Sequence, residues 1–272
     1  MMKTSFSTLA CPDWSLAEIL RGASTYGYDG VELRAISREL DLWNLPEFQS
    51  GSLFATRTLI EDHNLVVVSM GSSACFHSPD VQELERNFDV VFRMAEIAAG
   101  LGAPSVRVFG DRIQSDSDRR QTAARIADSL GRLAERLKHA EIEVWLETHG
   151  DFAHSADVEE IFAQLDDLKV GIIWDPANAF AQSGEAPLIH SQLASRVRHV
   201  HLKDLRKEAP SARYVLTGEG EFPFKTMFAS LEGIGFDGFV SFEWEKLWHP
   251  ELAAPEIALP HFIQWWKSRE AV

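Results

Sequence analysis

The sequence predicts a (β/α)8 barrel, and two observations lead to that prediction. Short β-branched apolar runs alternate strictly with longer amphipathic runs along all 272 residues. Strict alternation indicates a parallel sheet with helical crossovers. Eight strand–helix pairs in a chain of this length are typical of a closed barrel, with an open doubly wound sheet as the alternative. No linker or low-complexity run divides the chain, so one domain over residues 1–272 is expected.

The predicted strands are short apolar runs, of which LVVVSM at 65–70 is the clearest. The other strands are predicted over residues 5–9, 30–34, 105–110, 142–147, 170–175, 197–204 and 238–243. Each is followed by a segment with apolar residues at helical spacing. These helices are predicted over residues 13–27, 52–63, 81–101, 118–140, 157–168, 187–196, 222–234 and 255–268. Asp13 or Ser15 can cap the first helix, and Gly102 and Pro104 close the third.

Composition indicates which kinds of binding partner and which cellular compartment to expect. Acidic residues outnumber basic ones 41 to 26, giving a formal charge of −15, so nucleic acid and anionic lipid are not expected as partners. Two cysteines make no disulfide framework, which favours a reducing compartment. No apolar run has the length of a signal peptide or a membrane span, so a soluble, cytoplasmic protein is expected. FIQWWK in the last helix packs on the barrel or forms a homo-oligomer interface.

Four consecutive predicted strands end in residues that can bind a metal. They end in Glu147, Asp175, His201 and Glu243. In a barrel these strand ends share one face, where active sites lie. Three carboxylates would repel one another without a cation, and the oxygen-rich set suits Mn²⁺, Mg²⁺, Co²⁺ or Zn²⁺. One divalent metal ion is therefore predicted, although Asp175 before Pro176 can also simply cap the next helix.

With these residues in place, the chain resembles the xylose isomerase-like TIM-barrel superfamily, the group of sugar phosphate isomerases and epimerases and of the AP endonuclease family 2. The resemblance covers nearly the whole length. It is carried, in order, by SLAEILRGASTYGYDGVELR, LETH, WDPAN, VHLKD, GEGEFPF and GFVSFEWE. It implies that the four residues hold a single catalytic metal. It also implies that Glu147 and Glu243 flank a sugar and move its proton.

The chemistry of such a site explains the need for these residues. A C–H beside a carbonyl is a weak acid, and a Lewis-acidic metal stabilises the cis-enediolate left by deprotonation. Return of the proton gives epimerisation or isomerisation, whereas loss of a β-hydroxyl gives dehydration. The expected activity is a metal-dependent isomerase or epimerase of a ketose or related polyol ketone. The alternative is a lyase or dehydratase of inosose, dehydroshikimate or keto-glycoside type. An endonuclease IV-like phosphodiesterase and a non-catalytic sugar-binding barrel are further hypotheses.

Five residues are candidates for substrate binding. Many family members carry His three residues after the sixth-strand aspartate. This chain has Asn178 there, which weakens the hypothesis of an endonuclease IV-like phosphodiesterase. His149 follows the fifth strand as a second acid/base, a hydroxyl ligand or a plain loop histidine. His77 follows the third strand, and Arg206 is chosen among the charged residues after His201. Arg34 lies two residues after Glu32 on one strand face, so it pairs with Glu32 or with substrate.

Overall fold

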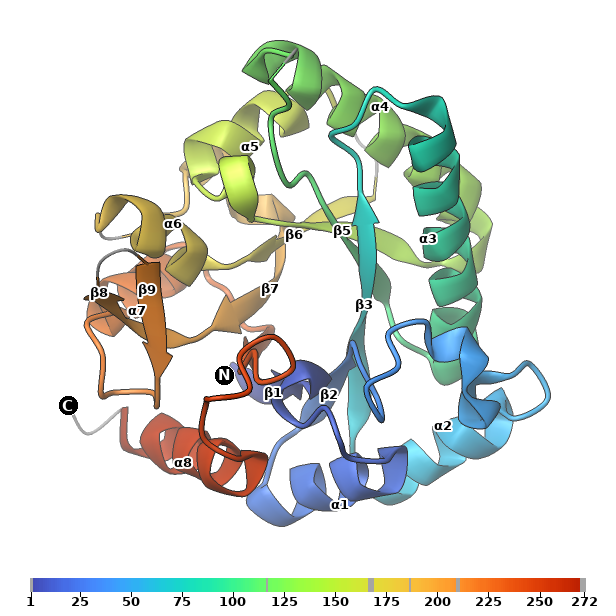
Figure 1. Cartoon of the computed structure of the whole chain (residues 1–272), viewed down its shortest axis with the longest axis vertical. Coiled ribbons are helices and arrows are strands. Elements are labelled where there is room, and N and C mark those ends of the chain that lie inside the picture. Colours follow the sequence, from blue (N-terminus) through green and yellow to red (C-terminus); the bar gives the residue numbers. More distant parts are fainter. Residues whose placement is uncertain (1, 116, 166–168, 186, 209–210, 270–272) are drawn as a thin grey trace.

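The computed structural model describes residues 2–115, 117–165, 169–185, 187–208 and 211–269. Eight parallel strands close into a barrel in the order β1-β10-β7-β6-β5-β4-β3-β2, surrounded by helices (Figure 1). This confirms the predicted (β/α)8 barrel and excludes the open sheet. The barrel strands are β1 (Lys3–Ser7), β2 (Gly30–Leu33), β3 (Val66–Cys75), β4 (Ser105–Phe109), β5 (Glu143–Glu147), β6 (Val170–Trp174), β7 (Val197–Leu202) and β10 (Phe239–Phe242).

The helices follow the strands around the outside of the barrel. They are α1 (Leu16–Tyr26), α2 (Leu53–Asp62), α3 (Val81–Leu101), α4 (Arg119–Leu137), α5 (Ser155–Phe162), α6 (Pro176–Ser183), α7 (Phe224–Gly233) and α8 (Pro255–Ser268). Short 3-10 helices cover Thr8–Ala10, Leu42–Asn44, Pro46–Phe48, Lys138–Ala140, Gly150–Phe152 and Ser191–Arg196. Within the described residues, no helix combines the length and apolarity needed to cross a bilayer.

Cap residues explain where the first helix begins and ends. Ser15 and Glu18 form a capping box, with the Ser15 amide donating to Glu18 Oε2 at 2.8 Å. Ser15, and not Asp13, is therefore the cap. The helix ends at Gly27, whose φ of 90° lies in the left-handed region that glycine tolerates.

The sixth helix differs from the prediction. Residues 191–196 form a 3-10 helix, and the α-helix of this unit is α6, directly after β6. Asp175 Oδ1 accepts from the backbone amides of Ala177 and Asn178, and Pro176 occupies the first turn, so the helix starts at once. The predicted helix over 157–168 is α5, and residues 166–168 lie outside the described part.

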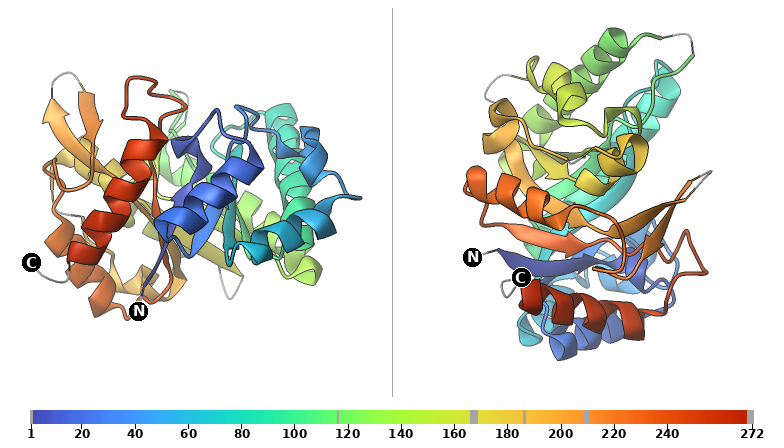
Figure 2. Two further views of the ribbon diagram at one scale, coloured as in Figure 1. Left: turned by 90° about the horizontal axis from the view of Figure 1, so that it is seen from below. Right: turned by 90° about the vertical axis from the view of Figure 1, so that its left-hand side faces the viewer.

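The predicted strand over 197–204 is also divided. β7 ends at Leu202, and Asp204 begins β8 (Asp204–Glu208), which pairs antiparallel with β9 (Ser211–Val215). Figure 2 shows this hairpin and the β10–α8 loop at one end of the barrel, opposite the N-terminus. Because the strands are parallel, that end holds the carboxyl ends of all eight.

Polar residues fill much of the barrel interior. Ser5 and Ser241 share a hydrogen bond of 2.7 Å between β1 and β10, and Ser105 donates to Ser69 at 3.0 Å between β4 and β3. The large apolar core therefore lies between the barrel and its helices. Phe6 and Val106, which follow Ser5 and Ser105 in sequence, are fully buried there. A polar interior leaves the carboxyl end of the barrel able to hold charged groups.

Candidate metal and substrate site

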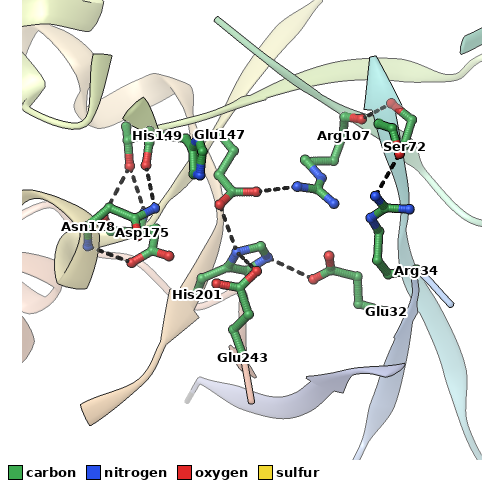
Figure 3. A network of polar contacts seen from close by, with 12 residues as sticks. Glu32, Arg34, Ser72, Arg107, Glu147, His149, Asp175, Asn178, His201 and Glu243 are labelled. Atoms are coloured by element: carbon green, nitrogen blue, oxygen red, sulfur yellow. Dashed lines mark hydrogen bonds and ion pairs between the residues drawn. The ribbon is translucent and has the colours of Figure 1, made fainter. Parts of the chain in front are cut away.

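The four predicted ligand residues meet at the carboxyl end of the barrel (Figure 3). Glu147 ends β5, Asp175 follows β6, His201 lies in β7 and Glu243 follows β10. Each offers one ligand atom, and these atoms all lie within 4.8 Å of one another. Every one of the four is at most 5% exposed. We call these residues the four-residue cluster.

The orientation of His201 is fixed from across the barrel. Its Nε2 lies 2.8 Å from Glu32 Oε2, an oxygen that also lies 3.2 Å from His199 Nε2. The other nitrogen, Nδ1, faces Glu243 Oε1 at 3.2 Å and Glu147 Oε1 at 3.6 Å, and makes no hydrogen bond within the described residues. A buried nitrogen so placed among carboxylates is the arrangement of a metal ligand backed by an outer carboxylate.

Shifted pKa values show the excess of negative charge. Burial raises the pKa of Asp175 to about 7, opposed by Lys203 and reinforced by Glu243 and Glu147. Burial would lower the pKa of His201, but the neighbouring carboxylates, Glu32 first, raise it well above its usual range. Both shifts favour proton uptake by the crowded cluster. A divalent cation would take the place of those protons, so the donor set fits a metal ion.

The two glutamates of the cluster stay ionised. Burial works against the charge of Glu147, but Arg107 Nη1 lies 2.8 Å from its Oε2 and lowers its pKa. The pKa of Glu243 lies well below its usual range because Lys203 and His201 outweigh burial. Ionised carboxylates that are held in place by ion pairs can accept a proton from a bound molecule.

Lys203 was not among the residues selected from the sequence, yet it belongs to this site. Its Nζ lies 2.7 Å from Asp175 Oδ2, 2.5 Å from Glu243 Oε2 and 2.8 Å from Glu245 Oε1. The sequence signal was the alternation of side chains: Lys203 follows His201 by two residues, and Glu245 follows Glu243 by two. The ammonium offsets part of the negative charge of the cluster.

A cavity of about 170 Å³ opens beside the cluster. It is smaller than the pockets that hold drug-sized ligands, so it suits a small polar molecule. Its lining consists of Leu9, Arg34, Arg107, Phe109, Glu147, His149, Lys203, Glu243, Glu245 and Trp248. Larger surface hollows, such as the one between α4 and the end of α5, lack the four-residue cluster.

The five substrate-binding candidates are divided by the structure. Arg34 and His149 line the cavity. Arg34 Nη2 donates to Ser73 Oγ at 2.7 Å, while Glu32 pairs with the histidines, so the expected Glu32–Arg34 pair is wrong.

The other three candidates do not line that cavity. Asn178 donates its amide to Thr148 O at 3.0 Å, and the exposed Arg206 donates to Glu219 O. His77 is buried near Cys75 and Asp111. Binding roles for all five remain predictions.

The sequence matches a known family. The family model described as xylose isomerase-like TIM barrel matches residues 20–268. The chain therefore belongs to the xylose isomerase-like TIM-barrel family, as the sequence motifs indicated.

The curated relatives that match the chain include inosose dehydratases. The inosose dehydratase of Lacticaseibacillus casei is 24% identical over 157 residues, which are 51% of this chain and 51% of that protein. The chain thus spans about half the length of the curated relatives it matches.

Two solved structures share the fold over nearly the full length. The IOLI protein with a bound zinc atom has a TM-score of 0.80 at 17% identity, covering 96% of this chain and 95% of its own. The 3-keto-D-glucoside 4-epimerase YcjR of E. coli has a TM-score of 0.76 at 18% identity, covering 98% and 100%. At such identities the likeness shows the fold alone.

Proposed function

We propose that this protein is a divalent-metal-dependent isomerase or epimerase of a small ketose or related polyol ketone. The observation that carries the proposal is the four-residue cluster, whose ligand atoms lie within 4.8 Å of one another and in which His201 Nδ1 faces the carboxylates of Glu243 and Glu147. Glu147, Asp175, His201 and Glu243 would hold the ion. When bound, a divalent cation would supply Lewis-acid stabilisation of the negative charge that develops on the substrate oxygens.

The protein's own residues would move the proton. Glu147, held by Arg107, and Glu243, held by Lys203, are ionised and line the cavity. One carboxylate takes the proton beside the carbonyl and becomes a carboxylic acid; that acid, or the other glutamate after it has taken a proton from solvent, then returns a proton to carbon. Return to the other face of the same carbon gives an epimer, and return to the neighbouring carbon gives an isomer. Arg34 and His149 would bind substrate hydroxyl or carbonyl oxygens from the cavity wall.

A dehydratase is the second candidate, because curated relatives of the chain include inosose dehydratases. The same proton abstraction then expels a β-hydroxyl as water in place of proton return. His149 lies on the cavity wall with its Nδ1 3.1 Å from Asp111 Oδ1, so its ring is oriented and its other nitrogen can contact a departing hydroxyl. The two candidates share every residue of the four-residue cluster.

Proton exchange in D₂O tests both candidates together. Ketoses and inososes are incubated with the Mn²⁺-loaded protein and followed by NMR. Solvent deuterium at the carbon beside the carbonyl is expected, and the product then identifies the reaction: an epimer or aldose, or an unsaturated ketone with loss of water.

Variants assign the exchange to the site. Glu243→Gln should keep the fold and most of the metal while losing exchange by at least about 100-fold, the contribution of a general base. Glu232→Gln, an exposed carboxamide replacement on α7, is the matched control. Full exchange by Glu243→Gln would contradict the assigned role.

A further inference from the structure

We propose that Cys75, His77 and Asp111 form a second metal site, suited to Zn²⁺ and separate from the four-residue cluster. Each residue offers one ligand atom, and the three atoms lie within 4.8 Å of one another. We call this set the sulfur-containing site. It shares no residue with the four-residue cluster, and its existence does not depend on the proposed function.

The barrel brings the three residues together through one strand pair. β3 and β4 are neighbours, and Cys75 at the end of β3 stands opposite Phe109 at the end of β4. The Phe76 amide donates to Phe109 O at 3.0 Å, which fixes the register just past the strand ends. His77 follows Cys75 by two residues and Asp111 follows Phe109 by two, so both lie just past the paired strand ends.

His77 is held in place but lacks a partner for one nitrogen. Only 7% of the residue is exposed, and its Nδ1 is buried without a hydrogen bond among the described residues. Its backbone oxygen accepts from Arg125 Nε at 3.2 Å, so the loop that carries it is anchored to α4. Leaving a buried polar nitrogen unpaired costs about 1–3 kcal/mol. A metal ion bound by the imidazole would give this buried ring a function.

Asp111 adopts a conformation that its neighbours impose. Its φ of 69° lies in the left-handed region, where a residue with a side chain is strained. Its backbone oxygen accepts from the Asp151 amide at 2.7 Å, and Gly150 permits this approach because a Cβ there would lie 2.1 Å from that oxygen. His149 Nδ1 then lies 3.1 Å from Asp111 Oδ1. The carboxylate is thus oriented by an outer partner, as metal-binding carboxylates commonly are.

The donor set indicates the kind of ion. One sulfur, one imidazole nitrogen and one carboxylate oxygen are the ligands that Zn²⁺ takes, and three protein ligands leave a fourth position for water or a ligand. Burial and the charge of Asp111 raise the pKa of the Cys75 thiol to about 11. Binding therefore forms a sulfur–metal bond and releases the thiol proton to solvent. Arg112 Nε, now 3.2 Å from Asp111 Oδ2, belongs to a side chain that is 71% exposed and free to turn away.

Cobalt titration of the whole chain tests the proposal, because Co²⁺ bound to a thiolate absorbs in the near ultraviolet by charge transfer from sulfur. The four-residue cluster contains no sulfur and cannot give this band. We expect two Co²⁺ per chain in the wild type, with the band, and its loss on addition of Zn²⁺. Asp175→Ala should bind one ion and keep the band. Cys75→Ser should bind one ion and lose it, and Asp111→Asn should weaken the binding that produces the band at least 10-fold.

Cys11→Ala is the matched control, since Cys11 is the other free thiol and lies buried in the core. It should keep the band, and circular dichroism checks that each variant folds. Absence of the band in the wild type, or its persistence in Cys75→Ser, would overturn the sulfur-containing site. Proton exchange of a ketone in D₂O would be unaffected by that result, whereas loss of exchange with the band intact would count against the proposed function alone.

Discussion

At the scale of single residues, Glu32 determines which nitrogen of His201 faces the four-residue cluster. It reaches from β2 to β7, strands that are not neighbours in the barrel, and one of its oxygens serves both His199 and His201. Burial opposes the charge of Glu32, but the two histidines hold its pKa well below its usual range. The carboxylate is therefore ionised and orients His201 without lining the cavity.

Replacing Glu32 by Gln should weaken metal binding without unfolding the protein. The amide oxygen can still accept from one imidazole, but the charge behind His201 is lost, so Mn²⁺ affinity should fall about 10–100-fold. Isothermal titration of wild type, Glu32→Gln and the exposed control Glu232→Gln measures this. Equal affinity in all three would show that Glu32 has no positioning role.

The Cys75 thiol gives a prediction for pH. Its pKa of about 11 lies well above the ordinary pKa of a thiol, so the reactive thiolate is scarce at neutral pH. About one thiol in a thousand is ionised at pH 8, and alkylation of the metal-free protein should accelerate nearly tenfold per pH unit up to about pH 11. Iodoacetamide labelling read by mass spectrometry follows Cys75 beside the fully buried Cys11, which should stay unlabelled. Rapid, pH-independent labelling of Cys75 would contradict this microenvironment.

That the four residues of the cluster lie together could be predicted from sequence, because each one stands at the end of a strand and the period of a strand fixes its face; their role as metal ligands stays a prediction. Their partners could not be predicted. Alternation placed Glu32 and Arg34 on one side of β2, but the identity of the group across the barrel depends on closure and register. Arg34 consequently contacts Ser73, and Glu32 contacts residues 167 and 169 positions away.

At the scale of elements, short segments with a strong cap were missed. Helix α6 has only eight residues and is capped by Asp175. The sequence offers a metal ligand and a helix cap as alternative roles for this residue. In the structure Asp175 caps the helix and also belongs to the four-residue cluster. The β8–β9 hairpin was missed because β7 and β8 form one continuous apolar-to-charged run in the sequence. The break falls at Lys203, whose ammonium is paired with Asp175 and Glu243 across the barrel end.

Asp204 should be the main support of the loop that follows this hairpin. Its Oδ2 accepts from the amides of Gly218 and Gly220, and its Oδ1 accepts from those of Leu205 and Phe222. Asp204→Ala should lower the free energy of unfolding by about 2–6 kcal/mol, because each of these four bonds contributes about 0.5–1.5 kcal/mol. Urea denaturation measures the loss, and Asp204→Asn, which retains one acceptor oxygen, should lose less. An unchanged urea midpoint for Asp204→Ala would show that Asp204 does not support this loop.

At the scale of the whole molecule, an ion held by the four-residue cluster should raise the stability of the fold. Crowded carboxylates at the carboxyl end make the metal-free state less favourable, and an ion that binds only the folded chain stabilises it. At a free Mn²⁺ concentration 100 times the dissociation constant, the gain is about 2.7 kcal/mol. Calorimetry should show a rise in melting temperature with Mn²⁺ that Asp175→Ala abolishes. An equal rise in that variant would place the stabilising ion elsewhere.

The central claim is that the four-residue cluster holds a divalent ion, and the most direct measurement is Mn²⁺ binding by equilibrium dialysis to metal-free wild type beside Asp175→Ala. Asp175 belongs to the cluster and is fully buried, with its Oδ2 2.7 Å from Lys203 Nζ and its Oδ1 at the start of helix α6. Mn²⁺ prefers oxygen ligands and avoids the sulfur-containing site. The account predicts one ion per chain in the wild type and none in Asp175→Ala. Equal binding by the two proteins, or no binding by either, would contradict it.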